Sequence, residues 1–307
     1  MNFKIFPVVG VLCIIFLLAL TWYIWKMPAS GQGSAEVVPN AGVGVTTPSG
    51  LGDKYASAIK AVQGSDARVE FETTNDLYRF VQKLSSPEES KNADSLWLIA
   101  KVVDYCYSYG ISPAGFTSDT EVLLRSASKD AAVALKAARD RVASRCSGFA
   151  GNSDDKTFSS LASLANKVRA AKAGSLAAEA SLIVLNSPLH TDPDYFSNLT
   201  QRITLSKDPD AYLAISDAVG VGAADRNPST SEFGTEHATY AWQLAACRRG
   251  LNCSSSGNLM SMYCVNGGVC GTYSNFEDLL FNGLLPASER VRVNEMTNRI
   301  LSQGELK

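Results

Sequence analysis

The stretch from Ala241 to Cys270 reads AWQLAACRRGLNCSSSGNLMSMYCVNGGVC, and it decides how the rest of the chain is interpreted. The spacing Cys-x-x-Gly-x-x-Cys occurs twice in it, from Cys247 to Cys253 and from Cys264 to Cys270. In each copy a run with helical character ends near the first cysteine, and the glycine that follows is typical of a helix end. We therefore expect one local unit, a helix end tied to the loop that follows it, to be used twice.

The cysteine count indicates disulfides. Six cysteines lie outside the N-terminal apolar segment: Cys106, Cys146, Cys247, Cys253, Cys264 and Cys270. An even number favours three disulfides in an oxidising compartment. The repeated spacing favours Cys247–Cys253 and Cys264–Cys270, which leaves Cys106–Cys146; the crossed pairs Cys247–Cys264 and Cys253–Cys270 are the main alternative. A structural zinc site normally contains more closely spaced cysteine pairs, so we expect no metal.

The N-terminal segment predicts a membrane anchor. Residues 5–25 carry no charge and are apolar nearly throughout, which is about the ~20 residues that a membrane-spanning helix needs. Trp22, Tyr23 and Trp25 precede Lys26, as expected at a lipid–water interface. We interpret residues 1–26 as a single transmembrane anchor in a bacterial inner membrane, with the C-terminal domain in the periplasm. A cleaved signal peptide and secretion are the alternative.

The composition that follows separates a linker from a folded domain. Residues 27–53 are rich in Gly, Ser and Pro, which predicts a flexible linker. Residues 54–307 are expected to form the disulfide-bonded domain. The whole chain has 28 Lys and Arg against 30 Asp and Glu, and this balance argues against a nucleic-acid surface, which needs a basic stripe. The expected partners are the lipid bilayer, through residues 5–25, and another protein.

Helix signals recur along the domain. Four sequences have the residue types that begin helices: Ser86-Pro87-Glu88-Glu89, Ser118-Asp119-Thr120-Glu121, Asp192-Pro193-Asp194 and Asp208-Pro209-Asp210. Apolar residues follow at helical spacing, for example Leu161, Leu164, Ala165 and Val168. The alternation in residues 68–72 (RVEFE) alone resembles a strand. We predict an all-α fold, either an irregular helical bundle or an α-solenoid-like domain.

Three of these helices look alike. Ser95–Cys106, Asp210–Gly220 and Tyr240–Gly250 each carry an aromatic residue near the start and end at Cys or Gly. The pattern resembles tetratricopeptide-type helical repeats and, more loosely, the cysteine-rich helical-repeat proteins in which each helix pair carries a disulfide. The resemblance covers residues 95–270 and lacks the fixed period of ~34 residues. It implies stacked helix pairs and a concave surface that binds a protein or peptide.

Candidate catalytic residues are few. The chain has two histidines, and His237 follows Glu236 in a predicted helix without a recognisable triad partner. His190 precedes two aspartates that could join it at a metal, but those aspartates are better explained as a helix start. Glu179 is an acid within an apolar helix, where we expect it to face solvent because buried Glu is rare. We assign no catalytic residue and no cofactor, and keep Glu179, Glu236 and His237 as alternatives.

The aromatic residues are the stronger candidates for partner binding. Tyr105, Tyr107 and Tyr109 alternate around Cys106, so one or two of them are expected at the surface, and Trp242 lies in the stretch quoted first. Packing around a disulfide is the alternative role. The sequence therefore favours a non-catalytic, membrane-tethered interaction or scaffold module. A helical cell-wall or peptide hydrolase and a periplasmic inhibitor or immunity protein are the alternatives.

Overall fold

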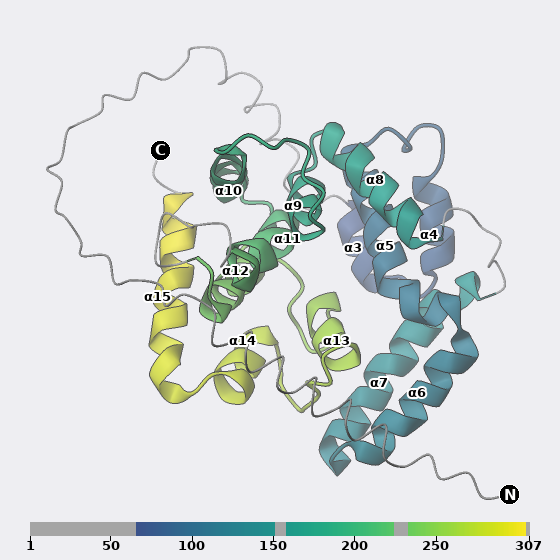
Figure 1. Cartoon of the computed structure of the whole chain (residues 1–307). Coiled ribbons are helices and arrows are strands. Elements are labelled where there is room, and N and C mark those ends of the chain that lie inside the picture. The colour runs from purple at the N-terminus through teal and green to yellow at the C-terminus, as the bar shows by residue number, and fades with distance from the viewer. Residues whose placement is uncertain (1–65, 151–157, 224–232, 305–307) are drawn as a thin grey trace, which may run out of the picture. The chain divides into compact units, whose positions relative to one another are not determined.

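The computed structural model describes residues 66–150, 158–223 and 233–304, and every regular element in these ranges is a helix (Figure 1). The predicted all-α class is confirmed. The predicted anchor at residues 1–26 and the linker at residues 27–53 lie outside the described residues. In the ranges that are described, no helix combines the length and the apolar character that crossing a bilayer requires.

The helices follow one another closely along the described chain. In order they are α3 (Asp66–Thr73), α4 (Leu77–Leu84), α5 (Ala93–Ile111), α6 (Pro113–Ser126), α7 (Lys129–Cys146), η1 (Ser147–Phe149), α8 (Ser160–Lys172), α9 (Leu176–Val184), α10 (Tyr195–Ser206), α11 (Pro209–Val219), η2 (Val221–Ala223), α12 (Glu236–Arg248), α13 (Asn258–Val265), α14 (Phe276–Leu279), η3 (Leu280–Leu284) and α15 (Ala287–Gln303).

Side-chain caps explain where the helices begin. The predicted start at Asp208-Pro209 is confirmed, because Asp208 Oδ1 accepts a hydrogen bond from the Asp210 amide at 3.1 Å. The predicted cap at Ser86 is wrong. Residues 85–91 form turns, and Glu89 accepts a hydrogen bond from the Ser95 hydroxyl at 2.6 Å. α5 begins instead after Asn92, whose side chain accepts from two backbone amides.

Three further sequence predictions are corrected. Residues 118–121 lie inside α6, which already begins at Pro113 after the capping residue Ser112. Residues 68–72 belong to α3 and not to a strand, with Phe71 buried and Val69 exposed. Residues 192–194 precede α10 as predicted, with Asp194 as the N-cap residue, but no aspartate side chain there accepts a capping hydrogen bond.

The buried face of α8 also differs from its apolar pattern. Leu161 is 74% exposed, whereas Ser163 and Lys167 are buried. Both of these side chains contact Asp104 on α5, the serine hydroxyl at 2.7 Å and the lysine ammonium at 2.7 Å. The polar contacts with α5 therefore set the orientation of α8, and apolar spacing alone could not reveal it.

α5 lies between two clusters of buried side chains, and Figure 1 shows it among α3, α4 and α8. Residues 95–100 are all buried, as expected of a helix surrounded by other helices. Its Leu98 and Val102 belong to the first core cluster, built mainly by α3–α7: Phe71, Leu77, Phe80, Leu98, Val102, Phe116, Leu135 and Val142. Its Leu96 and Trp97 join the second core cluster, built mainly by α8–α15: Leu199, Ile203, Tyr212, Ile215, Trp242, Leu244, Phe276 and Val293.

The disulfide pairing is the one that the spacing favoured. Cys106–Cys146 joins α5 to α7, while Cys247–Cys253 and Cys264–Cys270 each tie a helix to the loop after it. The two local units are not identical. Gly250 has a φ of 105° in the first, whereas in the second the positive φ of 67° belongs to Gly268, one position later than the repeat predicts.

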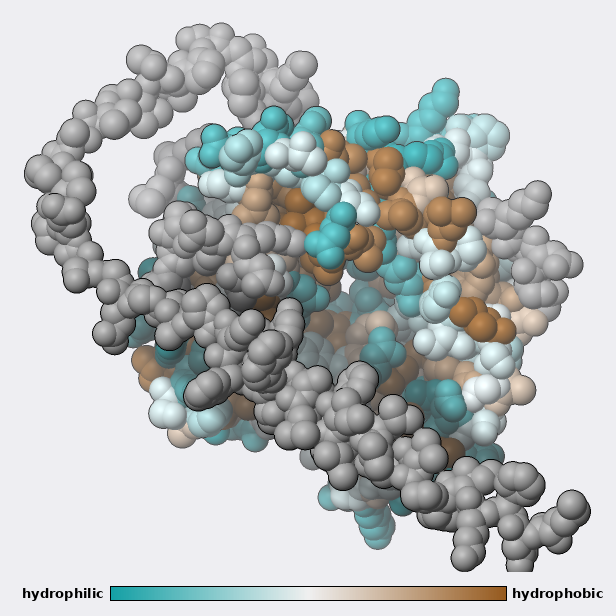
Figure 2. Space-filling model, viewed as in Figure 1, coloured by the Kyte–Doolittle hydropathy of each residue, from teal (hydrophilic) through white to brown (hydrophobic). Residues whose placement is uncertain are grey.

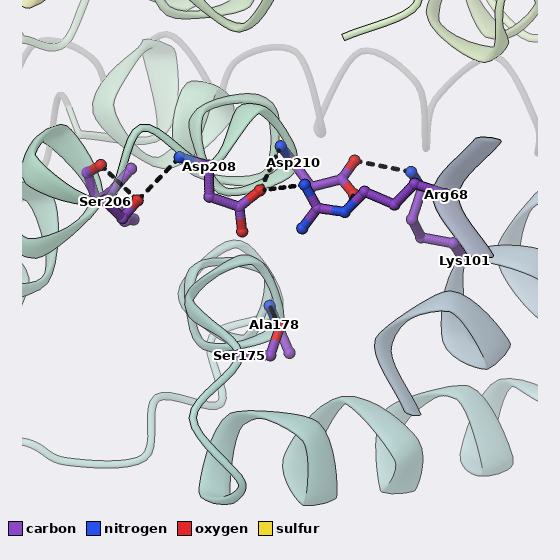
Figure 3. A network of polar contacts seen from close by, with 8 residues as sticks. Arg68, Lys101, Ser175, Ala178, Ser206, Asp208 and Asp210 are labelled. Atoms are coloured by element: carbon purple, nitrogen blue, oxygen red, sulfur yellow. Dashed lines mark hydrogen bonds and ion pairs between the residues drawn. The ribbon is translucent and has the colours of Figure 1, made fainter. Parts of the chain in front are cut away.

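Buried charges connect the two core clusters. Asp210, at the start of α11, is 3% exposed, and its carboxylate lies 2.8 Å from Lys101 Nζ on α5 and 3.3 Å from Arg68 Nε on α3. Arg68 also contacts Asp208 at 2.8 Å, and Figure 3 shows both carboxylates directed toward it. Burial alone would raise the pKa of Asp210, but Lys101 and Arg68 together lower it.

We predict that Asp210→Asn lowers the free energy of unfolding by about 3–5 kcal/mol at pH 7, because it removes the carboxylate paired with Lys101 and one of the two carboxylates paired with Arg68. Since the folded-state pKa of Asp210 lies below that of an unfolded Asp, its stabilisation is present at neutral pH and is lost as the pH falls through the folded-state value. Urea denaturation of the full-length protein measures the change.

Glu72→Gln is the matched control in the same region. Burial raises the pKa of Glu72 despite the proximity of Lys101, so its charge disfavours folding at neutral pH. Its neutral isostere is expected to leave the free energy of unfolding unchanged or slightly higher. Equal losses from the two substitutions would contradict this interpretation of the cluster.

The disulfides generate a second prediction. Cys106–Cys146 closes a loop of 40 residues, whereas each local disulfide closes a loop of 6. The chain-entropy model gives a stabilisation of about 4 kcal/mol for the long loop and about 2 kcal/mol for a short one. Replacing Cys106 and Cys146 by Ser should therefore lower the denaturation midpoint more than replacing Cys247 and Cys253. The reverse order would show that loop length does not dominate.

Candidate functional site

A pocket with a volume of about 680 Å³ opens between α11 and α12, and the end of α9 and α13 complete its wall. Its polar lining consists mainly of Asn186, Asp217, Glu236, Thr239, Tyr240, Gln243 and Tyr263. Here it is called the acidic pocket, because it holds two carboxylates and no Lys, Arg or His among its lining residues. It is the larger of two hollows in this part of the described surface.

Helix geometry places three of these side chains together. Glu236, Tyr240 and Gln243 stand four and three residues apart on α12, which puts them on one face of the helix. Gly220, at the end of α11, lets that helix approach them closely. A Cβ atom at Gly220 would lie only 1.7 Å from Thr239 Oγ1, so any larger residue would force α11 and α12 apart.

Two hydrogen bonds order the pocket. The Tyr240 phenol donates to Glu236 Oε1 at 2.5 Å, and the Tyr263 phenol donates to Gln243 Oε1 at 2.6 Å. Burial, with added repulsion from Asp217 and Glu236, raises the pKa of Tyr263 to about 12. Burial and the contact with Glu236 also raise the pKa of Tyr240. Both phenols therefore stay protonated at neutral pH. Asp217 and Glu236 both contribute to the raised pKa of Tyr263.

Asp217 differs from the other acids whose pKa burial raises. Burial is the single cause that raises the pKa of Asp217. The comparable acids Glu72, Asp94 and Asp208 each have a nearby cation that opposes the effect of burial. Although Asp217 is exposed, partial burial raises its pKa, and no cation among the described residues opposes that effect.

A second, smaller hollow of about 240 Å³ lies beside the acidic pocket, and Asn186 lines both. It is here called the apolar hollow, because Ile183, Pro188 and Phe196 line it. Asp192 and His190 also belong to its lining. Asn186 follows α9 in a left-handed conformation with a φ of 53°. The two hollows therefore adjoin at this residue.

The rim between these hollows includes exposed apolar side chains. Val184 is 38% exposed, Leu185 47% and Val221 62%, and two of the three line the acidic pocket. Figure 2 shows apolar residues exposed among hydrophilic ones in the region of α8 and α9. The site thus combines an acidic interior with an apolar edge.

Glu179 does not lie where the sequence predicted. It is 5% exposed, and the guanidinium of Arg202 holds it through two hydrogen bonds of 2.9 and 2.8 Å. The Tyr195 phenol donates a third at 2.9 Å. The predicted solvent-facing position is therefore wrong, because a partner on the next helix neutralises the buried charge. This carboxylate joins α9 to α10 and lines neither hollow.

Glu236 and His237 are neighbours in sequence, but their side chains have different surroundings. Glu236 lines the acidic pocket, while His237 Nε2 lies 2.8 Å from Glu289 Oε2 on α15. His190 packs its ring against Tyr195 at a centroid distance of 5.3 Å. No group of three potential metal ligands occurs in the three described ranges.

The aromatic residues singled out in the sequence are mostly internal. Tyr105 is 5% exposed and Trp242 is 4% exposed, so both belong to the core clusters. Tyr109 packs edge-on against Phe116, and Tyr107 is 39% exposed. None of the four lines either hollow.

Sequence reasoning missed Asp217, Tyr240, Gln243 and Tyr263. The spacing of Glu236, Tyr240 and Gln243 was a visible signal, since it places three polar groups on one helix face. Asp217 and Tyr263 gave no such signal, because α11 and α13 bring them to the pocket from separate parts of the chain.

Comparison with known proteins adds no assignment to this site. No protein-family model matches the chain, and neither a curated protein nor a solved structure is similar to it. The chemistry of the site is therefore inferred from its own residues.

Proposed function

We propose that this domain is a binding module outside the cytoplasm, and that the acidic pocket and the apolar hollow together bind an extended segment of another protein. The observation that carries the proposal is that two adjoining hollows, of about 680 and 240 Å³, share Asn186. Alternate side chains of an extended peptide can enter separate pockets while the backbone crosses the turn that the two hollows share.

The disulfides support the proposed location. Three cysteine pairs are joined in this structure, and stable disulfides are typical of oxidising compartments. With the anchor predicted at residues 5–25, they support a module tethered to a bacterial inner membrane and facing the periplasm. An inhibitor or immunity protein would be one form of such a module, with a secreted toxin as its partner.

The contacts of Glu179 and His237, which the sequence offered as catalytic alternatives, also support binding rather than catalysis. Glu179 is held by Arg202 and Tyr195, and His237 is paired with Glu289. A nucleophile–base pair with an orienting third group is the arrangement that covalent catalysis requires. These pairs instead join one helix to another, which is a structural role.

A hydrolase is the second candidate, because Asp217 has a raised pKa in the same pocket as Glu236. Glycoside hydrolysis uses one protonated and one ionised carboxyl group across the scissile bond. Both residues are exposed, and Glu236 already accepts a hydrogen bond from Tyr240. If purified full-length protein releases sugar or peptide fragments from peptidoglycan, and Asp217→Asn abolishes the release, the hydrolase replaces the binding module.

Site-specific photocrosslinking in membranes of the native host tests the binding module. A benzophenone amino acid replaces Val221, which is 62% exposed at the acidic pocket, or Val133, which is 69% exposed on α7 and lines neither hollow. We expect one protein adduct from Val221 and none from Val133. A synthetic peptide with the crosslinked partner sequence should compete for the adduct. Equal yields from both positions, or no adduct at Val221, would contradict the proposal.

A further inference from the structure

We propose that the acidic pocket recognises a cationic side chain, a lysine ammonium or an arginine guanidinium, on an extended peptide whose neighbouring apolar side chain enters the apolar hollow. This inference rests on the proposed function and names the chemistry of its ligand. Four features of the described residues carry it: unmatched negative charge, tyrosine rings, an apolar rim and the position of the second hollow.

Among the described residues, the negative charge of the pocket has no positive partner. Asp217 and Glu236 both line it, and neither forms an ion pair with a described residue. The buried acids Asp210 and Glu179, in contrast, lie within 2.8 Å of a Lys or Arg nitrogen. A cationic ligand would supply to Asp217 the partner that these other carboxylates find within the chain.

The tyrosines favour a cation over a neutral or anionic group. Tyr240 and Tyr263 both line the pocket, and an aromatic face attracts an ammonium or guanidinium placed over it. Each phenol hydrogen is already donated within the protein, to Glu236 and to Gln243. An anionic ligand would therefore meet two carboxylates and no free phenol donor.

The rim suits the stem of a long basic side chain. Val184 and Val221 are exposed at the edge of the pocket, and Ala218 also lines it. Lys and Arg place their methylene groups along apolar surface while the charged end reaches a polar site. A short cation without such a stem would leave this edge uncovered.

The second hollow favours a peptide as the source of the cation. Ile183, Pro188 and Phe196 line it, and it shares Asn186 with the acidic pocket. In an extended peptide, every second side chain points to the same side of the backbone. Two such side chains can therefore enter the two hollows. A free polyamine carries no apolar side chain for the second hollow.

Peptide binding to the full-length protein in detergent micelles tests the inference. The probe is the peptide Gly-Lys-Gly-Leu-Gly with a neutral fluorophore, and fluorescence anisotropy measures its dissociation constant. The variant with both Asp217→Asn and Glu236→Gln should weaken binding about five- to tenfold, because two exposed charge contacts are lost. The matched control joins Asp140→Asn with Glu121→Gln, which removes two exposed charges on α7 and α6. It should change binding less than about twofold, since both residues lie away from the pocket.

Three results would overturn the inference. The peptide with an acetylated lysine binds as tightly as the lysine peptide, or the pocket variant binds the lysine peptide as tightly as the unmodified protein does. The third result is that the lysine peptide shows no saturable binding. Spermidine that competes as strongly as the peptide would show that a free polyamine is the ligand. Circular dichroism confirms that each variant is folded.

The crosslinking experiment separates this inference from the proposed function. If the Val221 adduct persists at full yield in the variant with Asp217→Asn and Glu236→Gln, the binding module stands and the cationic ligand does not. If Val221 gives no adduct in the unmodified background, the binding module itself fails.

Discussion

The carboxylate of Asp210 is the group on which the arrangement of the helices depends. An isolated buried charge is strongly unfavourable, so a carboxylate with 3% exposure requires cations at short distance. Lys101 on α5 and Arg68 on α3 meet this requirement, and in doing so they fix two helices of the first core cluster against α11 in the second. The same helix carries Asp217 toward its other end, so the position of the acidic pocket follows from this junction.

Asp210 and Asp217 are two acids of one helix in different environments. Both belong to α11, yet the cations around Asp210 lower its pKa, whereas burial raises the pKa of Asp217 with no opposing charge. A structural ion pair is complete within the chain, and its removal weakens folding. We propose that Asp217, which lines an open pocket, finds its partner in a ligand instead. The argument for a cationic ligand rests on the two acids, the two tyrosines and the apolar edge of the pocket, and the raised pKa of Asp217 supports it.

The sequence predicted those features that depend on local spacing. The even number of cysteines and the repeated Cys-x-x-Gly-x-x-Cys pattern predicted the disulfides, and Asp208-Pro209 predicted the start of α11. It failed where distant residues meet. Glu179 was expected in solvent because buried Glu is rare, but Arg202 on another helix pairs with it. The apolar spacing predicted a buried Leu161 on α8, whereas Leu161 is exposed and Lys167 is buried and pairs with Asp104 on α5. Apolar periodicity carries no information about a polar side chain that is buried because it pairs with a charged group on another helix.

The twofold cysteine unit connects oxidation to the site. Cys247 lies in the last turn of the helix that carries Tyr240 and Gln243, and Cys264 lies one residue after Tyr263 on α13. The hydrogen bond from Tyr263 to Gln243 therefore joins the two disulfide-tied helices across the pocket. Each disulfide restricts the loop that leaves its helix, so the orientation of both helices at the pocket is restrained by bonds that form only under oxidising conditions. The stretch that indicated the compartment is thus also the stretch that builds one wall of the proposed binding site.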